Sequence, residues 1–270
     1  MPVRLSLTLR GPAPDGPHAH ASGLRALVYA SIARGDPALA QWLHTANQPK
    51  PLTVGPLRTA DDNPELHSVL LTSTADPFSD ALLHGLPEEG SEIRLGPQTY
   101  TVAERRLICR VSFGSIVQDL PDSPAVTIRL LTPTAHHAPG TLRRTILTPQ
   151  PRLYLGSWLA RWNLSCDLLI PETLLSAAEE YIVVSGFRGG TVAVPLDARR
   201  TFIGYIGTVQ FTVLGNAPEA RQLRETLWAL ARFAEFCGTG VETMRGMGQT
   251  RLVRRPDPDT PTRHGHPLCG

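Results

Sequence analysis

This sequence has no long apolar runs, no closely spaced pairs of cysteines and very little lysine. No apolar run is long enough for a membrane-spanning helix, and the N-terminal Met-Pro-Val-Arg-Leu has no signal-peptide core. The four cysteines form no C-x-x-C pair, which argues against a zinc site. We therefore expect a cytoplasmic protein with no membrane partner, no metal and no cofactor.

Lysine occurs once, at Lys50, so that 25 of the 26 lysines and arginines are arginine. Arginine binds phosphate through a planar fork and stacks on bases, but a net charge of +2 is weak support for nucleic-acid binding. The chain also has 25 prolines, and a GC-rich coding bias explains most of the arginines equally well. This bias makes Lys50 stand out, because arginine was available there.

The first half of the chain predicts a ferredoxin-like series of elements. Residues 3–9 alternate apolar and polar side chains, as a half-buried strand does. Two helices follow, one over residues 24–32 with Ser22 as N-cap, and one over 37–44 that Asp36 can cap. Strands are expected near 52–58, 68–74, 92–102 and 105–117, with a helix that begins near Pro77. This is the β-α-β-β-α-β order of the ferredoxin-like motif.

The second half predicts the same series again after a linker at Pro121-Asp-Ser-Pro124. The expected elements are strands 125–131, 142–147, 181–185, 191–195 and 202–214, and helices 152–163 and 218–237, with an exposed turn over 186–190. The fold class is therefore α+β, with two tandem ferredoxin-like (RRM-like) domains. We place them at residues 1–123 and 124–255, and we expect the Pro-, Asp- and His-rich tail 256–270 to be disordered.

A glycine-rich loop follows the last predicted helix, with the sequence Gly238-Thr-Gly-Val-Glu-Thr-Met-Arg-Gly-Met-Gly-Gln249. Its glycines permit backbone conformations closed to other residues, and successive exposed N–H groups there would suit an anion. The spacing is not the dinucleotide fingerprint, and no Gly-Lys-Ser/Thr occurs, so nicotinamide and ATP binding are not indicated. The alternative is a loop that merely closes a helix–strand corner.

Residues 233–249 resemble the C-terminal signature of the CRISPR-associated endoribonucleases that cut repeat RNA, which are members of the RAMP superfamily. Glu242 departs from this pattern, because family members usually carry lysine there. Further similar segments occur in the expected order at residues 24–29, 39–44, 130–135, 161–163 and 186–189. The resemblance reaches about residue 255 and implies two ferredoxin-like domains, as the order of elements does.

Three side chains between residues 29 and 50 are candidates for catalysis. Histidine suits proton transfer near neutral pH, and the Gly35-Asp36-Pro37 corner folds the second helix back so that His44 approaches Tyr29. The residues alone also allow a helix-end histidine, a packed tyrosine and a solvated Lys50. The resemblance implies that His44 is the general acid or base. It also implies that Tyr29 orients or helps to deprotonate the 2′-hydroxyl, and that Lys50 stabilises the phosphorane.

Other residues are candidates for the same cleft or for RNA binding. His18, His20, His136 and His137 compete with His44 as proton donors. The expected RNA contacts are Arg143, Arg144, Arg188, Arg245 and Arg251, together with Gly238, Gly240, Gly246 and Gly248, and Arg232 is expected to support the glycine-rich loop. The aromatic content of 6% favours recognition of backbone and shape over base stacking.

The resemblance implies a metal-independent endoribonuclease that cleaves CRISPR repeat transcripts (pre-crRNA) to release guide RNAs. Attack by the 2′-hydroxyl would leave a 2′,3′-cyclic phosphate and a 5′-hydroxyl. One alternative is a non-catalytic RAMP subunit that holds guide RNA in an effector complex, for which Glu242 leaves room. Another is an unrelated ferredoxin-like protein. The sequence leaves open whether other effector subunits or a second copy of the chain are partners.

Overall fold

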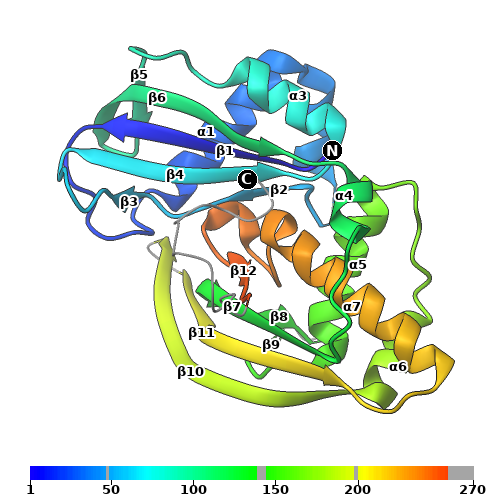
Figure 1. Cartoon of the computed structure of the whole chain (residues 1–270). Helices are drawn as coiled ribbons and strands as arrows, with labels where there is room; N and C mark the ends of the chain where they lie inside the picture. The colour runs from blue at the N-terminus through cyan, green and yellow to red at the C-terminus, as the bar shows by residue number, and fades with distance from the viewer. Residues whose placement is uncertain (47–48, 139–143, 198–199, 255–270) are drawn as a thin grey trace.

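The N-terminal half forms an antiparallel sheet in ferredoxin-like strand order. A computed structural model describes residues 1–46, 49–138, 144–197 and 200–254 (Figure 1). Strand β1 (Val3–Arg10) lies between β4 (Leu66–Ser73) and β6 (Gln98–Arg110). The order is β2-β4-β1-β6-β5, with β2 at Leu52–Val54, β5 at Glu92–Leu95 and β3 (Arg58–Thr59) also paired with β4. The predicted β-α-β-β-α-β series is confirmed, and β5 adds an edge strand.

One face of this sheet is covered by helices, which makes the N-terminal core. These are α1 (Ala21–Gly35), α2 (Pro37–Thr45) and α3 (Asp76–Gly85). Leu5, Leu7 and Leu9 alternate along β1 and are buried against apolar residues of α1. Alternation on the strand and helical spacing on α1 therefore point the two apolar surfaces at each other.

The C-terminal half repeats the same strand order in a second sheet, β10-β11-β7-β12. Its strands are β7 (Ala125–Thr134), β10 (Ile182–Asp197), β11 (Arg200–Val213) and β12 (Thr250–Leu252). The helices are α5 (Pro151–Ser165), α6 (Leu174–Tyr181) and α7 (Pro218–Cys237), and a short β8–β9 ladder joins His136–His137 to Thr145–Ile146. Trp158, Trp162 and Phe233 are fully buried in this core. The α+β class with tandem ferredoxin-like domains is confirmed.

Helix α7 connects the two halves. In Figure 1 it lies between the two sheets, and its C-terminal end contacts β1 and β4. The Arg4 guanidinium donates to the Glu235 carbonyl at 2.6 Å, and the Thr72 hydroxyl donates to the Phe236 carbonyl. The segment that follows α7 therefore reaches both halves. Pro121–Pro124 lies between α4 (Phe113–Val117) and β7 without helix or strand, and we keep the domain boundary there.

Two predicted strand boundaries are wrong in the N-terminal half. Strands were expected at 92–102 and 105–117, but β5 turns into β6 at Gly96, and β6 runs unbroken through residues 102–105. Gly96 has φ +64°, a conformation that favours glycine in a tight hairpin turn. Residues 113–117 form α4, whose Ser112 cap accepts from the Ser115 N–H at 3.0 Å.

The predicted turn over residues 186–190 is also wrong, because β10 runs straight through it. Gly189 lies opposite Gly207 of β11. A Cβ at Gly189 would lie 2.1 Å from the Ile206 carbonyl oxygen, so the glycine permits close approach of two strands. Arg188 is exposed on this ribbon and not on a turn.

The helix caps were predicted with mixed success. Asp36 caps α2 as expected, and its carboxylate accepts from the N–H groups of Ala38 and Leu39 at 2.8 and 3.1 Å. Ser22 does not cap α1, since this helix already begins at Ala21 and its N-cap is His20. Within the described ranges, no helix is both long and apolar enough to span a bilayer. The tail 256–270 and its expected disorder lie outside the described residues.

Candidate active site

A cleft of about 860 Å³ separates α1 and α2 of the N-terminal half from α5 and the glycine-rich loop of the C-terminal half. All three expected catalytic side chains line it. The lining residues that the chemistry below uses are Arg25, Tyr29, His44, Lys50, His136, His137, Arg152, Ser157, Arg161, Gly240 and Glu242. Residues far apart in the sequence therefore meet at one concave site, as in most binding sites.

Tyr29 and His44 lie side by side in the cleft. Their ring centroids are 4.8 Å apart with an interplanar angle of 56°. Tyr29 is 9% exposed, and its hydroxyl donates to the Leu43 carbonyl at 3.3 Å. His44 is exposed on the last turn of α2. The Asp36-capped corner thus produces the expected approach, while the roles of both side chains in catalysis remain a prediction.

Lys50 holds the end of the helix that carries His44. Its amine donates to the carbonyls of Leu43 and Ala46, the second at 2.7 Å. A cation that binds the last carbonyls of a helix stabilises its C-terminus. Burial lowers the pKa of the Lys50 amine, and the positive charge of Arg25 lowers it further. In this structure Lys50 is a support of α2 at the edge of the cleft.

Arg25 is one of the cleft residues that the sequence did not indicate. It precedes Tyr29 by one helical turn, its guanidinium carbon lies 5.2 Å from the Tyr29 ring centroid, and its Nη2 is 3.5 Å from the Tyr29 hydroxyl. The i, i+4 spacing from Tyr29 was the available signal, because such residues are neighbours on a helix surface. In an arginine-rich chain, that spacing alone did not distinguish Arg25 from the other arginines.

The opposite wall of the cleft is built around the buried Arg161. Its guanidinium donates to the Ser157 carbonyl and hydroxyl at 2.9 and 2.7 Å, and to the Gly240 carbonyl at 2.9 Å. The Gly240 N–H donates to the Ser157 hydroxyl at 2.9 Å. Burial lowers the pKa of Arg161, which is 5% exposed. This residue therefore ties the glycine-rich loop to α5.

The glycine-rich loop does not present a row of free N–H groups, contrary to the reasoning from sequence. The N–H groups of residues 239, 240, 241, 248 and 249 all donate to protein oxygens. Its glycines at 238, 240, 246 and 248 all have φ between +67° and +87°, and Met244 packs into the N-terminal core. The loop closes the corner between α7 and β12 and joins the two halves. Contact of its glycines with RNA remains a prediction.

The described arginines that were expected to bind RNA do not line the cleft. Arg144, Arg188 and Arg251 are exposed, whereas Arg245 is 13% exposed with its Nε 3.6 Å from the Glu242 carboxylate. Arg143 lies outside the described residues. Arg232 does not support the glycine-rich loop, because its guanidinium donates to the carbonyls of residues 116, 118 and 119 at the end of α4 and just after it.

Of the competing histidines, His136 and His137 line the cleft, whereas His18 and His20 do not. The His20 ring lies 2.9 Å from the Tyr100 hydroxyl. His136 is 6% exposed and its ring centroid is 4.8 Å from that of Tyr154. Burial lowers the pKa of His136 to about 4, helped by the charges of Arg161 and His137. His136 is therefore neutral near pH 7.

Replacement of His136 by phenylalanine is expected to remove part of the acid sensitivity of folding. The pKa of His136 lies below the ordinary 6.5, so the unfolded chain takes up a proton between pH 6.5 and 4 that the folded chain does not. Stability is therefore full above pH 6.5 and falls as the pH is lowered, by about 2 kcal/mol at pH 5. Urea unfolding of wild type and His136→Phe at about pH 7.5 and pH 5 checks this. Equal pH effects in the two proteins would contradict it.

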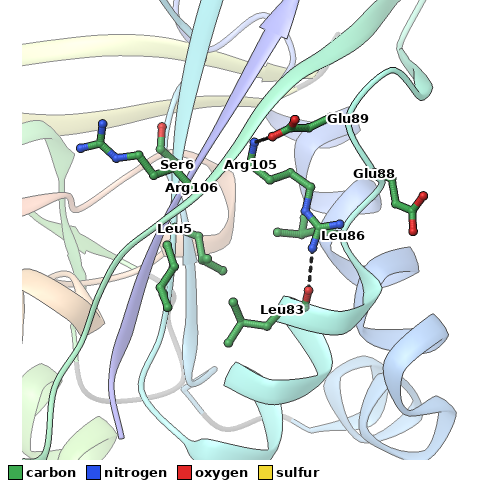
Figure 2. A pocket seen from close by; sticks show the side chains of 9 residues that line it. Leu5, Ser6, Leu83, Leu86, Glu88, Glu89, Arg105 and Arg106 are labelled. Atoms are coloured by element: carbon green, nitrogen blue, oxygen red, sulfur yellow. Dashed lines mark hydrogen bonds between the residues drawn. The ribbon is translucent and has the colours of Figure 1, made fainter.

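A second hollow of about 550 Å³, shown in Figure 2, lies beside β6 and the end of α3. Its Arg105 guanidinium donates to the Leu83 carbonyl at 2.8 Å, and the Arg105 N–H donates to the Glu89 carboxylate at 3.1 Å. No histidine, cysteine or tyrosine is among its lining residues. The cleft of Tyr29 and His44 is the better candidate for chemistry. In the described part of the chain, no group of three or more His, Cys, Asp or Glu could hold a metal ion.

Two ferredoxin-like sheets of the same strand order are joined by a glycine-rich loop at the cleft between the two halves. The family model of CRISPR-associated endoribonuclease Cas6 matches residues 128–250. A Cas6 product complex is similar with a TM-score of 0.78 and 27% identity, covering 94% of this chain and all of that chain. Thermus thermophilus Cas6 has a TM-score of 0.70 and 27% identity, covering 94% and 98% of the two chains. These matches show that the chain is similar to Cas6 proteins.

A curated relative is the CRISPR-associated endoribonuclease Cas6 of Mycobacterium tuberculosis (strain CDC 1551 / Oshkosh). It is 27% identical over 177 residues, which are 65% of this chain and 53% of the relative. The chain thus spans about half the length of the curated relatives it matches. The structural likeness to the product complex, in contrast, extends over nearly the whole of both chains.

Proposed function

We propose that this protein is a cytoplasmic endoribonuclease that processes CRISPR repeat RNA into guide RNAs without a metal ion. The observation that carries the proposal is the pairing of the exposed His44 with Tyr29 in an open cleft, in a chain that is similar to Cas6 proteins. A histidine that is free of the core and packs against a tyrosine ring is equipped for proton transfer to and from ribose and phosphate oxygens.

The proposed reaction is an in-line attack of the ribose 2′-oxygen on the adjacent phosphorus. The 2′-hydroxyl loses its proton, the bond between phosphorus and the 5′-oxygen breaks, and the leaving 5′-oxygen gains a proton. His44 serves as general acid or base, and Tyr29 orients the 2′-hydroxyl or shares in its deprotonation. The products are a 2′,3′-cyclic phosphate and a 5′-hydroxyl.

Lys50 was assigned to the phosphorane by resemblance, and it lies within the same cleft. Lys50 donates hydrogen bonds to two backbone carbonyls at the end of α2. It can reach a phosphate oxygen only by releasing at least one of them. We keep stabilisation of the phosphorane by Lys50 as a proposal. In this structure Lys50 acts first on the position of His44, because it holds the end of α2.

RNA contacts outside the cleft are proposed for the exposed Arg144, Arg188 and Arg251 and for the glycine-rich loop. Arg251 lies directly opposite Arg129 in the β7–β12 pair. Like charges directly opposite each other destabilise a sheet unless an anion lies between them, so a phosphate of bound RNA would relieve this pair. Arg245 would act less directly, because its side chain is half-buried beside Glu242.

The rival function is a RAMP subunit that holds guide RNA in an effector complex without cutting it. Glu242 favours this rival, because it lines the cleft where members of the resembling family usually carry lysine. A carboxylate there repels the scissile phosphate. The two functions differ in whether the RNA backbone is broken.

Cleavage of end-labelled repeat RNA in EDTA tests the proposal. Wild type is expected to cut at one position and to leave a 2′,3′-cyclic phosphate, with the same rate before and after EDTA is added. The matched control is the same RNA with a 2′-deoxy sugar at the cut site, which is expected to bind and remain intact. Tight binding of the unmodified repeat without any cleavage would establish the guide-RNA holder instead.

A further inference from the structure

Four cationic side chains of arginine or lysine are among the described residues of the cleft, and they differ in what they bind. Arg161 is buried and donates to Ser157 and Gly240. Arg152 forms an ion pair with Glu179 at 2.8 Å. Lys50 donates to two helix-end carbonyls. Arg25 differs from these three, because the described residues offer it only a long contact of 3.5 Å to the Tyr29 hydroxyl.

Arg25 places a positive charge beside Tyr29 and His44, the two groups proposed to transfer protons. It lies over the Tyr29 ring, whose other neighbour is His44 at 4.8 Å between ring centroids. Its positive charge also reaches Lys50, whose pKa it helps to lower. Arg25 and Lys50 are two cations in the same cleft, and they repel each other. In the described chain, no carboxylate lies within 4 Å of Arg25 to offset this repulsion. An anion between them would remove this repulsion.

A guanidinium is also the better match for a phosphate than an amine. Its planar fork can donate two parallel hydrogen bonds to two non-bridging oxygens. A guanidinium does not act as an acid or a base near neutral pH, because it stays protonated. A cation in this place therefore neutralises charge and positions the phosphate, and it leaves the proton transfers to His44 and Tyr29.

We propose that Arg25 is a catalytic residue of this cleft, whose guanidinium binds the non-bridging oxygens of the scissile phosphate and neutralises the charge of the phosphorane. This inference rests on the proposed endoribonuclease function. During the reaction the 2′-oxygen forms its bond to phosphorus, the 5′-oxygen leaves, and the net proton moves from the 2′-oxygen to the 5′-oxygen. Arg25 donates hydrogen bonds throughout and gives up no proton, while Lys50 keeps the end of α2 in place.

Single-turnover cleavage by Arg25→Ala and Arg25→Lys tests the assignment. We expect Arg25→Ala to lose about 10²- to 10³-fold in rate, since removal of one preorganised donor to a transition-state oxyanion has that effect. Arg25→Lys is expected to recover only part of it, because an amine cannot form the paired contact. The matched control is Arg94→Ala, which removes an exposed arginine of β5 that donates to the Gly96 carbonyl. This control is expected to cleave like wild type.

Rescue by free guanidinium distinguishes catalysis from a structural role. Millimolar guanidinium is expected to restore cleavage by Arg25→Ala with saturation, and not to restore cleavage by His44→Ala. A loss in Arg25→Ala that neither guanidinium nor the lysine variant relieves would overturn the assignment, as would a rate equal to wild type. Should wild type itself fail to cut the repeat, the proposed function falls first. Should wild type cut only RNA with the 2′-hydroxyl while Arg25→Ala cuts equally well, Arg25 alone is wrongly assigned.

Discussion

Cleavage of repeat RNA is expected to slow by roughly 10²- to 10⁴-fold when His44 is replaced by alanine, the range that general acid–base catalysis contributes. His44 is exposed and belongs to none of the buried clusters. Its removal costs the contact with Tyr29, which stays in place through its own bond to the Leu43 carbonyl. The fold and the affinity for RNA are therefore expected to change little.

Single-turnover rates and binding constants for the same RNA, measured side by side, check this result. His84→Ala is the matched control, because His84 is also a histidine of the last turn of a helix, α3, and its ring is bonded to the Asp80 carbonyl. It is not among the residues that line the cleft. His84→Ala is expected to cut normally. A His44→Ala protein that cuts within a few-fold of wild type would remove His44 from the mechanism and turn attention to His137, which lines the opposite wall.

Replacement of Gly240 by alanine is expected to destabilise the fold strongly. Gly240 has φ +78°, and a Cβ there would lie 2.2 Å from the Ala135 carbonyl oxygen, which is backbone and cannot rotate away. Left-handed backbone costs an L-residue about 1–2 kcal/mol, and overpacking adds about 1–3 kcal/mol. We therefore expect a loss of about 2–5 kcal/mol in the free energy of unfolding.

The matched control for Gly240 is Gly215→Ala. Gly215 has nearly the same backbone conformation, with φ +79°, but no atom within 4 Å of an added Cβ. Its substitution is expected to cost only the conformational term of about 1–2 kcal/mol. Denaturant unfolding of both variants separates the cost of the left-handed backbone conformation from the cost of the contact between the added Cβ and the Ala135 carbonyl oxygen. Because Gly240 is bonded to Arg161 and Ser157, cleavage is also expected to fall in the folded fraction of Gly240→Ala. Equal losses for both variants would show that the contact with Ala135 is unimportant.

The order of helices and strands could be predicted from local sequence patterns, but the exact ends of some strands and the path of the Gly186–Gly190 segment could not. Alternation over β1 and helical spacing over α7 depend on residues close in sequence, and both elements lie where they were expected. The Gly186–Gly190 segment was misjudged as a turn, because a glycine cluster has the same local signature in a turn and in a tightly paired ribbon. The paired ribbon forms because Gly189 lies opposite Gly207 on the neighbouring strand.

The candidate site shows the same division. The approach of His44 to Tyr29 follows from one short corner, since Asp36 caps α2 directly after α1 ends. The glycine-rich loop was located correctly, but the N–H groups of residues 240, 241, 248 and 249 are bonded to residues 132–135 and 157, which precede the loop by about a hundred positions. Contacts over such a separation leave no spacing in the sequence from which they can be read.

By itself the sequence determined the two ferredoxin-like series, the corner that brings Tyr29 and His44 together, and the position of the glycine-rich loop. Each depends on periodicity, capping or glycine content within a few residues. Only the tertiary structure decided that Lys50 supports a helix end, that Arg161 fastens the loop to α5, and that Arg25 is left without a carboxylate in the described chain. A charge acquires its role from its partners, and those partners are chosen when the two halves of the chain pack together.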